Sequence, residues 1–348
     1  MTIAGVASAF PQHRYDQRVL LSALQRHWGP KLDNPVFMER LQARVGVESR
    51  HLALPIEEYY TLNWTQANNH WIEVAQDLGQ KALCCALSRA GLAPSDLGAL
   101  FFVSITGISS PSIDARLVNR MGLPVNIKRV PIFGLGCVAG AAGIARASDY
   151  VLAYPKQVAA VLSVELCSLT LQQDDLSIAN VISSGLFGDG AAAVLVAGAE
   201  RESTGPEILA TRSVFYPNSE HVMGWDISEK GFRIVLSREV PEVVHDHLAS
   251  DVDAFLEEQG LARADIGSWI LHTGGPRVLE ATATALELKD GELSASWDCL
   301  RRTGNLSSAS VLVVLEEVML KRRPPAGTFS LLAAMGPGFC SELVLMRW

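Results

Sequence analysis

Apolar residues along this chain recur in two patterns, which predict an alternation of helices and strands. Short apolar runs, such as residues 99–104, 130–135 and 268–271, have the length and composition of buried strands. Stretches rich in alanine, or in serine and alanine, begin behind Gly136 and Gly304 and have the composition of helices. Glycine and proline residues separate the two kinds of segment. The order helix, strand, helix, strands predicts an α/β fold.

The predicted elements occur twice along the chain. Residues 91–98 recur as residues 260–267 with five identities in eight positions, at an offset of 169 residues (260 minus 91), and an apolar strand-like run follows each copy. Further on, residues 136–142 are matched by residues 304–310 at an offset of 168 (304 minus 136). A repeat in constant register predicts two copies of one structural unit, which constrains the fold more strongly than local propensity does.

The end of the repeat locates an insertion in the first copy. Each copy closes with a Gly-x-Gly turn before an apolar strand, residues 188–190 in the first and 336–338 in the second, and here the offset falls to 148 (336 minus 188). We place the extra residues, about twenty, in 170–184. The copies are expected to pack about a pseudo-twofold axis, each burying its helices against a mostly parallel sheet, with residues 1–90 as an N-terminal addition to the first. Ligands usually bind where such halves meet.

Composition and charge exclude several classes of protein. The chain has 348 residues, of which 49% are hydrophobic and 19% charged, as in a folded soluble protein. Its net charge of −8 argues against a nucleic-acid partner. The six cysteines form no CxxC pair or zinc-type cluster and no secretory leader precedes them, which predicts reduced thiols, a cytoplasmic location and no metal. The longest apolar stretch, 307–319, is shorter than the ~20 residues that span a bilayer.

Three residues at the ends of repeated elements could form a composite catalytic site. Cys137 begins the helix of the first copy, Asn305 holds the equivalent position in the second, and His272 ends a strand of the second copy. Backbone N–H groups at a helix start favour a thiolate, so we expect a lowered pKa for Cys137 and an ion pair with His272. The side-chain N–H of Asn305 would polarise a carbonyl oxygen.

Each of the three residues also has an ordinary structural explanation. Free cysteine is among the most buried residue types, so Cys137 alone is compatible with inert packing. His272 alone is compatible with a hydrogen-bonded core histidine, and Asn305 with a helix N-cap. The coincidence of all three at the ends of duplicated elements favours a site.

Four segments carry recognisable motifs: GLGCVAGAA at 134–142, ISSGLFGDGAAAV at 182–194, HTGGP at 272–276 and TGNLSSAS at 303–310. They resemble the type III polyketide synthases, the chalcone synthase superfamily. Ile234, Trp225 and the acidic, compact N-terminus resemble bacterial members more than plant chalcone synthases. The resemblance implies a thiolase-like fold of duplicated α/β halves in an αβαβα arrangement, with the nucleophilic cysteine in residues 1–205 and the histidine and asparagine in residues 206–348. It also implies a homodimer, no cofactor, and a catalytic triad of Cys137, His272 and Asn305.

The resemblance further implies substrate-binding roles. Phe187 matches a gatekeeper phenylalanine between a coenzyme A tunnel and the reaction cavity, and Ile234 stands where a second gatekeeper is commonly phenylalanine. Arg40 and Arg44 match basic residues that hold the phosphates of coenzyme A. The other substrate-binding positions lie in the cavity or in the closing Gly-Pro-Gly turn, and are Thr106, Cys167, Thr170, Trp225, Ser307, Gly336, Pro337 and Gly338.

The implied reaction is decarboxylative condensation of malonyl-CoA onto an acyl starter carried on Cys137, followed by cyclisation to a pyrone, a resorcinol or a related aromatic product. The substrates would be acyl-CoA and malonyl-CoA. Two alternatives remain open: a ketosynthase III-like enzyme that takes its extender from an acyl carrier protein, and a non-catalytic binder of acyl thioesters. The HTGGP segment, where ketosynthases usually carry HQAN, and the presence of all three triad residues favour the polyketide synthase.

Overall fold

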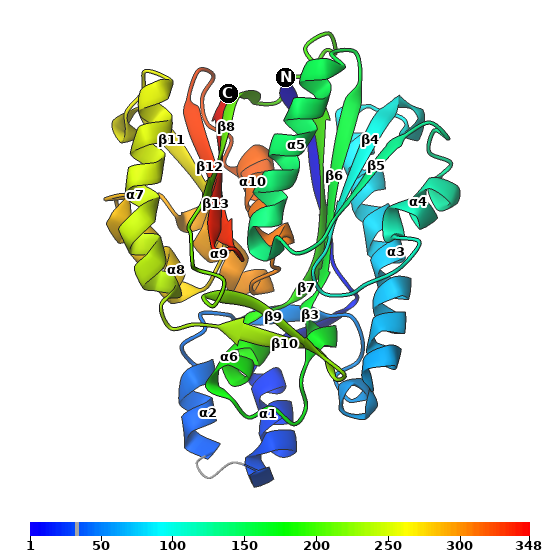
Figure 1. Cartoon of the computed structure of the whole chain (residues 1–348), viewed down its shortest axis with the longest axis vertical. Coiled ribbons are helices and arrows are strands. Elements are labelled where there is room, and N and C mark those ends of the chain that lie inside the picture. The colour runs from blue at the N-terminus through cyan, green and yellow to red at the C-terminus, as the bar shows by residue number, and fades with distance from the viewer. Residues whose placement is uncertain (32–34) are drawn as a thin grey trace.

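The computed structural model describes residues 1–31 and 35–348, and its centre is a sheet that runs through both halves of the chain (Figure 1). The strand order is β11-β12-β13-β8-β1-β7-β6-β4-β5. The order is symmetric about the contact of β8 with β1, where Thr2 pairs with Glu207, and among the described residues only β5 has no counterpart. The strands of this sheet are β1 (Thr2–Ala9), β4 (Leu97–Val103), β5 (Lys128–Ile132), β6 (Val158–Leu166), β7 (Asp189–Ala197), β8 (Glu207–Phe215), β11 (Ile266–Leu271), β12 (Phe329–Gly336) and β13 (Cys340–Arg347).

Strand directions differ from the expected mostly parallel sheet. β4 runs parallel to β5 and β6, and β11 runs parallel to β12. The strands near the centre are antiparallel, including β6 with β7, β12 with β13, and β1 with β7. The prediction of a mostly parallel sheet is therefore wrong. The reason is visible in the second half, where the Gly-Pro-Gly turn is too short for a parallel crossover and reverses the chain directly from β12 into β13.

Helices cover the two halves of the sheet and complete a layered body. α5 (Ala139–Ala153) and α10 (Ala309–Lys321) lie between the halves and share one apolar cluster with strands of both. α3 (Trp64–Ala90) covers the outer face of the first half, and α7 (Val240–Glu258), with α8 (Pro276–Ala285) packed against it, covers that of the second (Figure 1). The predicted αβαβα arrangement is confirmed. The remaining helices of this body are α4 (Ile113–Met121) and α9 (Ser294–Thr303).

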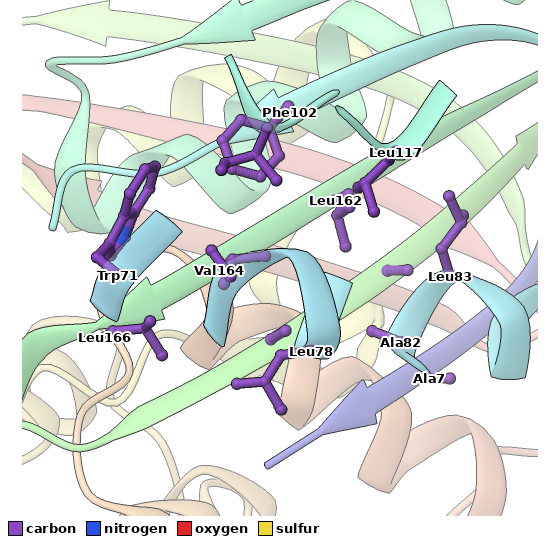
Figure 2. Packing of buried hydrophobic residues seen from close by; sticks show 14 of the residues in the cluster. Ala7, Trp71, Leu78, Ala82, Leu83, Phe102, Leu117, Leu162, Val164 and Leu166 are labelled. Atoms are coloured by element: carbon purple, nitrogen blue, oxygen red, sulfur yellow. The ribbon is translucent and has the colours of Figure 1, made fainter. Parts of the chain in front are cut away.

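The sequence of α3 explains its boundaries and its packing. The Asn63 side chain accepts a hydrogen bond from the Gln66 N–H, and the Gln66 side chain accepts one from the Asn63 N–H, which caps the start. Gly91 ends the helix in the left-handed conformation, with φ of 65°. Figure 2 shows the buried side of the helix, with Leu78 and Leu83, against the strands of the first half. Burying a leucine fully contributes about 1.5–3 kcal/mol.

The two central helices approach each other closely at Gly140. A Cβ atom on this residue would lie 2.2 Å from the Ser308 carbonyl oxygen, so no side chain fits there. Gly140 therefore allows the close contact between the starts of α5 and α10. That contact brings the two equivalent helix starts of the repeat together.

The duplication is confirmed in the order of the elements. β4, α5, β6 and β7 of the first half correspond to β11, α10, β12 and β13 of the second. The predicted insertion is confirmed as well, because α6 (Ile178–Leu186) lies between β6 and β7, whereas a short turn connects β12 to β13. The structure narrows the expected N-terminal addition, since β1 and α3 correspond to β8 and α7 and so belong to the repeated unit. The division after residue 205 falls between β7 and β8 and stays a prediction.

The rest of the N-terminal addition lies together with α6 at one end of the molecule (Figure 1). Its helices α1 and α2 share a small apolar cluster with α6, formed around Leu24, Trp28, Met38 and Val181. The elements at this end are β2 (His13–Asp16), α1 (Gln17–Trp28), α2 (Pro35–Gln42), β3 (Ser49–Leu52), β9 (Met223–Ser228) and β10 (Gly231–Leu236). Across the described residues, no helix has the length and apolar character to span a membrane.

Candidate active site

Cys137 occupies the helix start that the repeat predicts. It lies in a short 3-10 turn, Gly136–Val138, that leads into α5. Its side chain is buried, with 5% of its surface exposed, and its Sγ donates a hydrogen bond to Ser307 Oγ at 3.7 Å. Gly136 has a φ of 54°, and a Cβ atom there would lie 2.8 Å from Pro337. Glycine at this position therefore lets the turn pack against Pro337 and fixes the thiol between the two halves.

His272 follows the last residue of β11, and its backbone N–H donates to the Ala333 carbonyl oxygen at 3.1 Å. The side chain is 8% exposed. Its Nδ1 atom is buried and finds no hydrogen-bond partner within the part of the chain that the structure describes. An unpaired buried nitrogen is uncommon in a structural histidine.

Burial sets the protonation of these two residues in the opposite sense to the one expected from the sequence. Desolvation raises the pKa of the Cys137 thiol to about 12 and lowers the pKa of the His272 imidazole to about 4. Both groups are therefore neutral near pH 7, and the prediction of a lowered cysteine pKa with a resting ion pair is wrong. The physical reason is that both side chains are almost fully removed from water, where a charge is costly.

Asn305 presents one half of its side-chain amide as a free donor. Its Oδ1 accepts from the Ser307 N–H at 2.8 Å and from the Ser310 hydroxyl at 3.3 Å. Among the described residues, none accepts a hydrogen bond from Nδ2. The backbone is fixed by hydrogen bonds of 2.9 Å to the Leu186 carbonyl and from the Gly188 N–H. Asn305 is therefore a rigidly held N–H donor.

A cavity of about 460 Å³ reaches His272, Asn305 and Phe187. Its wall contains residues of both halves of the chain and is largely apolar, with contributions from α6, α7 and β12. Arg44 and two arginines that the sequence comparison did not select, Arg238 and Arg277, also line it. Arginines from separate segments are suited to binding phosphate groups. The cavity thus joins a cationic region to the two candidate donors.

A second cavity, of about 80 Å³, shares Phe187 with the larger one. Trp225 and Ile234 stand opposite each other in the β9–β10 hairpin, and the Trp225 indole donates to the Ile105 carbonyl at 3.0 Å. Ile234 lines only the smaller of the two cavities, whereas Phe187 lines both cavities. The predicted pocket residues that line the smaller cavity are Cys167, Thr170, Trp225 and Ile234.

The other predicted substrate-binding residues lie outside the walls of these two cavities, as the described residues define them. Ser307 contacts the Cys137 thiol. Thr106 is buried, and its hydroxyl donates to Glu165 at 3.0 Å and accepts from the Leu166 N–H at 2.9 Å. Arg40 is exposed on α2. The Gly336, Pro337 and Gly338 turn packs against the Cys137 turn and Phe215.

Sequence reasoning selected Arg44 but missed the other two arginines of the large cavity, because neither lies in a basic cluster. Arg277 directly follows the HTGGP segment, and this position was the one available signal. Arg238 stands just before α7, in the segment that also holds Ile234, where nothing marked it as a phosphate-binding residue. Charged residues of this kind usually form a solvated surface, and only folding shows that they share a wall.

Comparison with known protein families matches both parts of the chain. Residues 54–200 match the family described as chalcone and stilbene synthases, N-terminal domain, and residues 207–348 match the C-terminal domain of chalcone and stilbene synthases.

Individual relatives extend over almost the whole chain. The 1,3,6,8-tetrahydroxynaphthalene synthase of Streptomyces peucetius subsp. caesius is 50% identical over 351 residues, which cover 100% of this chain and 93% of the relative. The phloroglucinol synthase of Pseudomonas fluorescens is 33% identical and covers 97% of each chain. The solved structure of 1,3,6,8-tetrahydroxynaphthalene synthase from Streptomyces coelicolor A3(2), a bacterial type III polyketide synthase, has a TM-score of 0.94 at 32% identity and covers 100% of this chain and 99% of that one.

Proposed function

Because this chain belongs to the chalcone and stilbene synthase family and is a type III polyketide synthase, we propose that Cys137, His272 and Asn305 are its catalytic residues. The enzyme is an acyltransferase that works on coenzyme A thioesters. The observation that carries the proposal is the larger cavity, which joins three arginines to His272 and Asn305 and meets a second cavity at Phe187. A thioester held by the arginines would extend along this cavity to Asn305, which Ser307 links to the Cys137 thiol.

Starter loading begins with a neutral thiol, because burial raises the pKa of Cys137. The Cys137 sulfur attacks the thioester carbonyl while His272, which is neutral, takes the thiol proton. A new carbon–sulfur bond forms, the bond to coenzyme A breaks, and the proton leaves with the coenzyme A thiolate. The product of this step is an acyl group on Cys137.

Extension requires an enolate, whose charge must be stabilised in a dry site. A malonyl thioester in the larger cavity would place its carbonyl oxygen near the Asn305 amide N–H and near His272, here in the tautomer whose N–H faces the cavity. Loss of carbon dioxide would leave the enolate bound to these two donors. Phe187 presents an apolar wall to the malonyl carboxylate, which favours neutral carbon dioxide. The enolate carbon then attacks the acyl group, the bond from the acyl carbon to the Cys137 sulfur breaks, and the extended chain is left as a coenzyme A thioester. The Cys137 thiol attacks this thioester, coenzyme A leaves, and the chain is back on Cys137 for a further extension or for cyclisation.

We propose that malonyl-CoA serves as both starter and extender and that the product is a fused hydroxylated aromatic of the tetrahydroxynaphthalene class. The proposal is supported by the relative of 50% identity, whose name is 1,3,6,8-tetrahydroxynaphthalene synthase.

The test is mass spectrometry of the products that purified enzyme forms from isotopically labelled malonyl-CoA, alone and with a panel of acyl-CoA starters. We expect a product whose carbon atoms all come from malonyl-CoA, and no product from Cys137→Ala. A product that always contains an acyl starter would refute the proposed starter. Turnover only with malonyl groups on an acyl carrier protein would instead support the ketosynthase III-like alternative.

We propose in addition that the enzyme is a homodimer and that it acts in the cytoplasm. Large apolar side chains remain exposed around β5 and the Ser110-Pro111 loop, among them Ile108, Phe133 and Leu135, which supports a covered interface. The six free cysteines support a reducing compartment. Sedimentation that gives only a 37.5 kDa species would contradict the dimer.

A further inference from the structure

The helix α6 separates the two cavities. One side of the helix, with Ile182 and Leu186, lines the larger cavity, and another side, with Ser183 and Ser184, lines the smaller. Phe187, which follows the helix, lines both. The inserted helix of the first half is therefore a partition, and its end carries the proposed gate.

We propose that Gln17, Gln42 and Arg50 are positioning residues that hold this partition and thereby fix Phe187 for the polyketide synthesis proposed above, on which this inference rests. All three belong to the N-terminal addition. Gln42 Nε2 donates to the Val181 carbonyl at 2.6 Å, and Gln17 Nε2 donates to the Gly185 carbonyl at 2.9 Å. The Arg50 Nη1 atom donates to the Phe187 carbonyl. Each side chain thus holds a backbone oxygen in or just after α6.

The three side chains are also joined to one another. Arg50 Nε donates to Gln17 Oε1 at 3.1 Å, and Gln17 Nε2 donates to Gln42 Oε1 at 3.1 Å. Gly185 gives them room, since a Cβ atom there would lie 1.8 Å from Gln42 Oε1. A side chain at this position would force the helix and the group of polar residues apart.

The contacts satisfy backbone groups that the helix itself leaves open. The last carbonyls of any helix have no partner within it. Here the Leu186 carbonyl accepts from the Asn305 N–H, while Gln17 and Arg50 supply donors to the carbonyls on either side, those of Gly185 and Phe187. Phe187 is consequently held from one side by the backbone of Asn305 and from the other by Arg50.

Arg50 is suited to this role by its burial and its shape. Only 3% of the side chain is exposed, and its stem packs on Gly304, where a Cβ atom would lie 3.1 Å from Arg50 Cδ. Burial lowers the pKa of the guanidinium to about 10, while the neighbouring Asp189 opposes this shift, so the group stays charged at neutral pH. One planar guanidinium donates to Gln17 and Phe187 at once, which a lysine ammonium on a flexible stem does not reproduce.

The test compares Arg50→Lys with Arg14→Lys, a control in the same β2–β3 ribbon whose guanidinium donates to Ser49 Oγ at 2.8 Å and not to α6. The readout is the ratio of full-length aromatic product to short lactones released early, measured at equal concentrations of Cys137 that malonyl-CoA can load. A misplacement of about 1 Å in a reacting assembly lowers rates up to ~10²-fold, so we expect the ratio to fall about tenfold in Arg50→Lys. The control should keep the wild-type ratio.

A merely structural role would lower all products in proportion and leave the ratio unchanged, and this outcome overturns the proposal. If Arg50 acts through Phe187, then Arg50→Lys should add no further change in a Phe187→Ala background. If Arg50→Lys lowers the product ratio by the same factor in the Phe187→Ala background as in the wild-type enzyme, the proposal is also overturned. Should Arg50→Lys not fold, Gln17→Met removes the half-buried link to Arg50 and Gly185 and is judged by the same two outcomes. A wild-type enzyme that makes no polyketide refutes the proposed function instead.

Discussion

Replacing Asn305 by alanine separates the two half-reactions of the proposed mechanism. The substitution removes the Nδ2 amide group, which donates to no other group among the described residues, while Oδ1 accepts from the Ser307 N–H and the Ser310 hydroxyl. That donor should act on the enolate of malonyl decarboxylation. Starter loading, in which Cys137 attacks a carbonyl and His272 takes a proton, depends on it much less.

The size of the effect follows from the burial of the donor. Asn305 is 2% exposed, so water replaces the lost N–H poorly. Removing one donor of this kind lowers the rate ~10²–10³-fold, which corresponds to about 2.7–4 kcal/mol of transition-state stabilisation. Decarboxylation should therefore fall by this factor, while loading of Cys137 changes by less than about tenfold.

His272→Ala should behave differently from Asn305→Ala. Because burial raises the pKa of the Cys137 thiol to about 12, loading needs a base, and His272 is the proposed one. Its removal should slow loading and decarboxylation alike. This contrast between the two variants is a consequence of the protonation states that the structure gives.

Two measurements on the same samples test the predicted difference between decarboxylation and loading. Carbon dioxide release from labelled malonyl-CoA reports decarboxylation, and intact-protein mass spectrometry after rapid quenching reports the acyl group on Cys137. Ser310→Ala is the matched control, because it removes a contact to Asn305 Oδ1 and leaves Nδ2 in place. Equal losses in both half-reactions of Asn305→Ala, or the same loss in Ser310→Ala, would refute the role of the amide as an enolate donor.

Four further predictions follow from the geometry. Ile234→Phe narrows the smaller cavity, so kcat/KM should fall progressively as the acyl starter lengthens and should change little for acetyl-CoA. Each methylene should contribute about 1–3 kcal/mol to this discrimination. Equal kcat/KM ratios across the starter series would show that another residue sets the selectivity. The rate at which iodoacetamide alkylates Cys137, followed by peptide mapping, should be low at pH 7 and rise steadily through pH 9, because the thiol is protonated below its pKa of about 12. A rate that reaches a plateau near pH 6 would instead indicate a thiolate paired with protonated His272. Gly140→Ala should lower the free energy of unfolding by about 1–3 kcal/mol in urea titration, since its Cβ would meet the start of α10; unchanged stability would show that the helices can separate there. Arg44→Ala should raise KM for malonyl-CoA at constant kcat, whereas Arg40→Ala should not, and equal KM values would remove Arg44 from coenzyme A binding.

Much of this enzyme was predictable because its sequence keeps the trace of a duplication. Matching segments at offsets of 169 and 168 residues identified two α/β halves and placed Cys137 and Asn305 at equivalent helix starts. The fall of the offset to 148 located the insertion that proves to be α6. These features are local, because a glycine turn and an apolar strand form from the residues of their own segment and are repeated wherever that segment is repeated. The relation of β1 and α3 to β8 and α7 left no such trace, so residues 1–90 were assigned as an addition.

Tertiary structure alone decided the properties that depend on exclusion of water and on residues from distant segments. The sequence placed a thiol at a helix start and so predicted a thiolate, yet the packing of both halves around Cys137 and His272 makes the neutral forms the stable ones. It gave no reason to group Arg44 with Arg238 and Arg277, which are far apart in the chain and share one cavity wall. A pKa and a cavity are properties of the whole surrounding volume, and that volume exists only once the chain has folded.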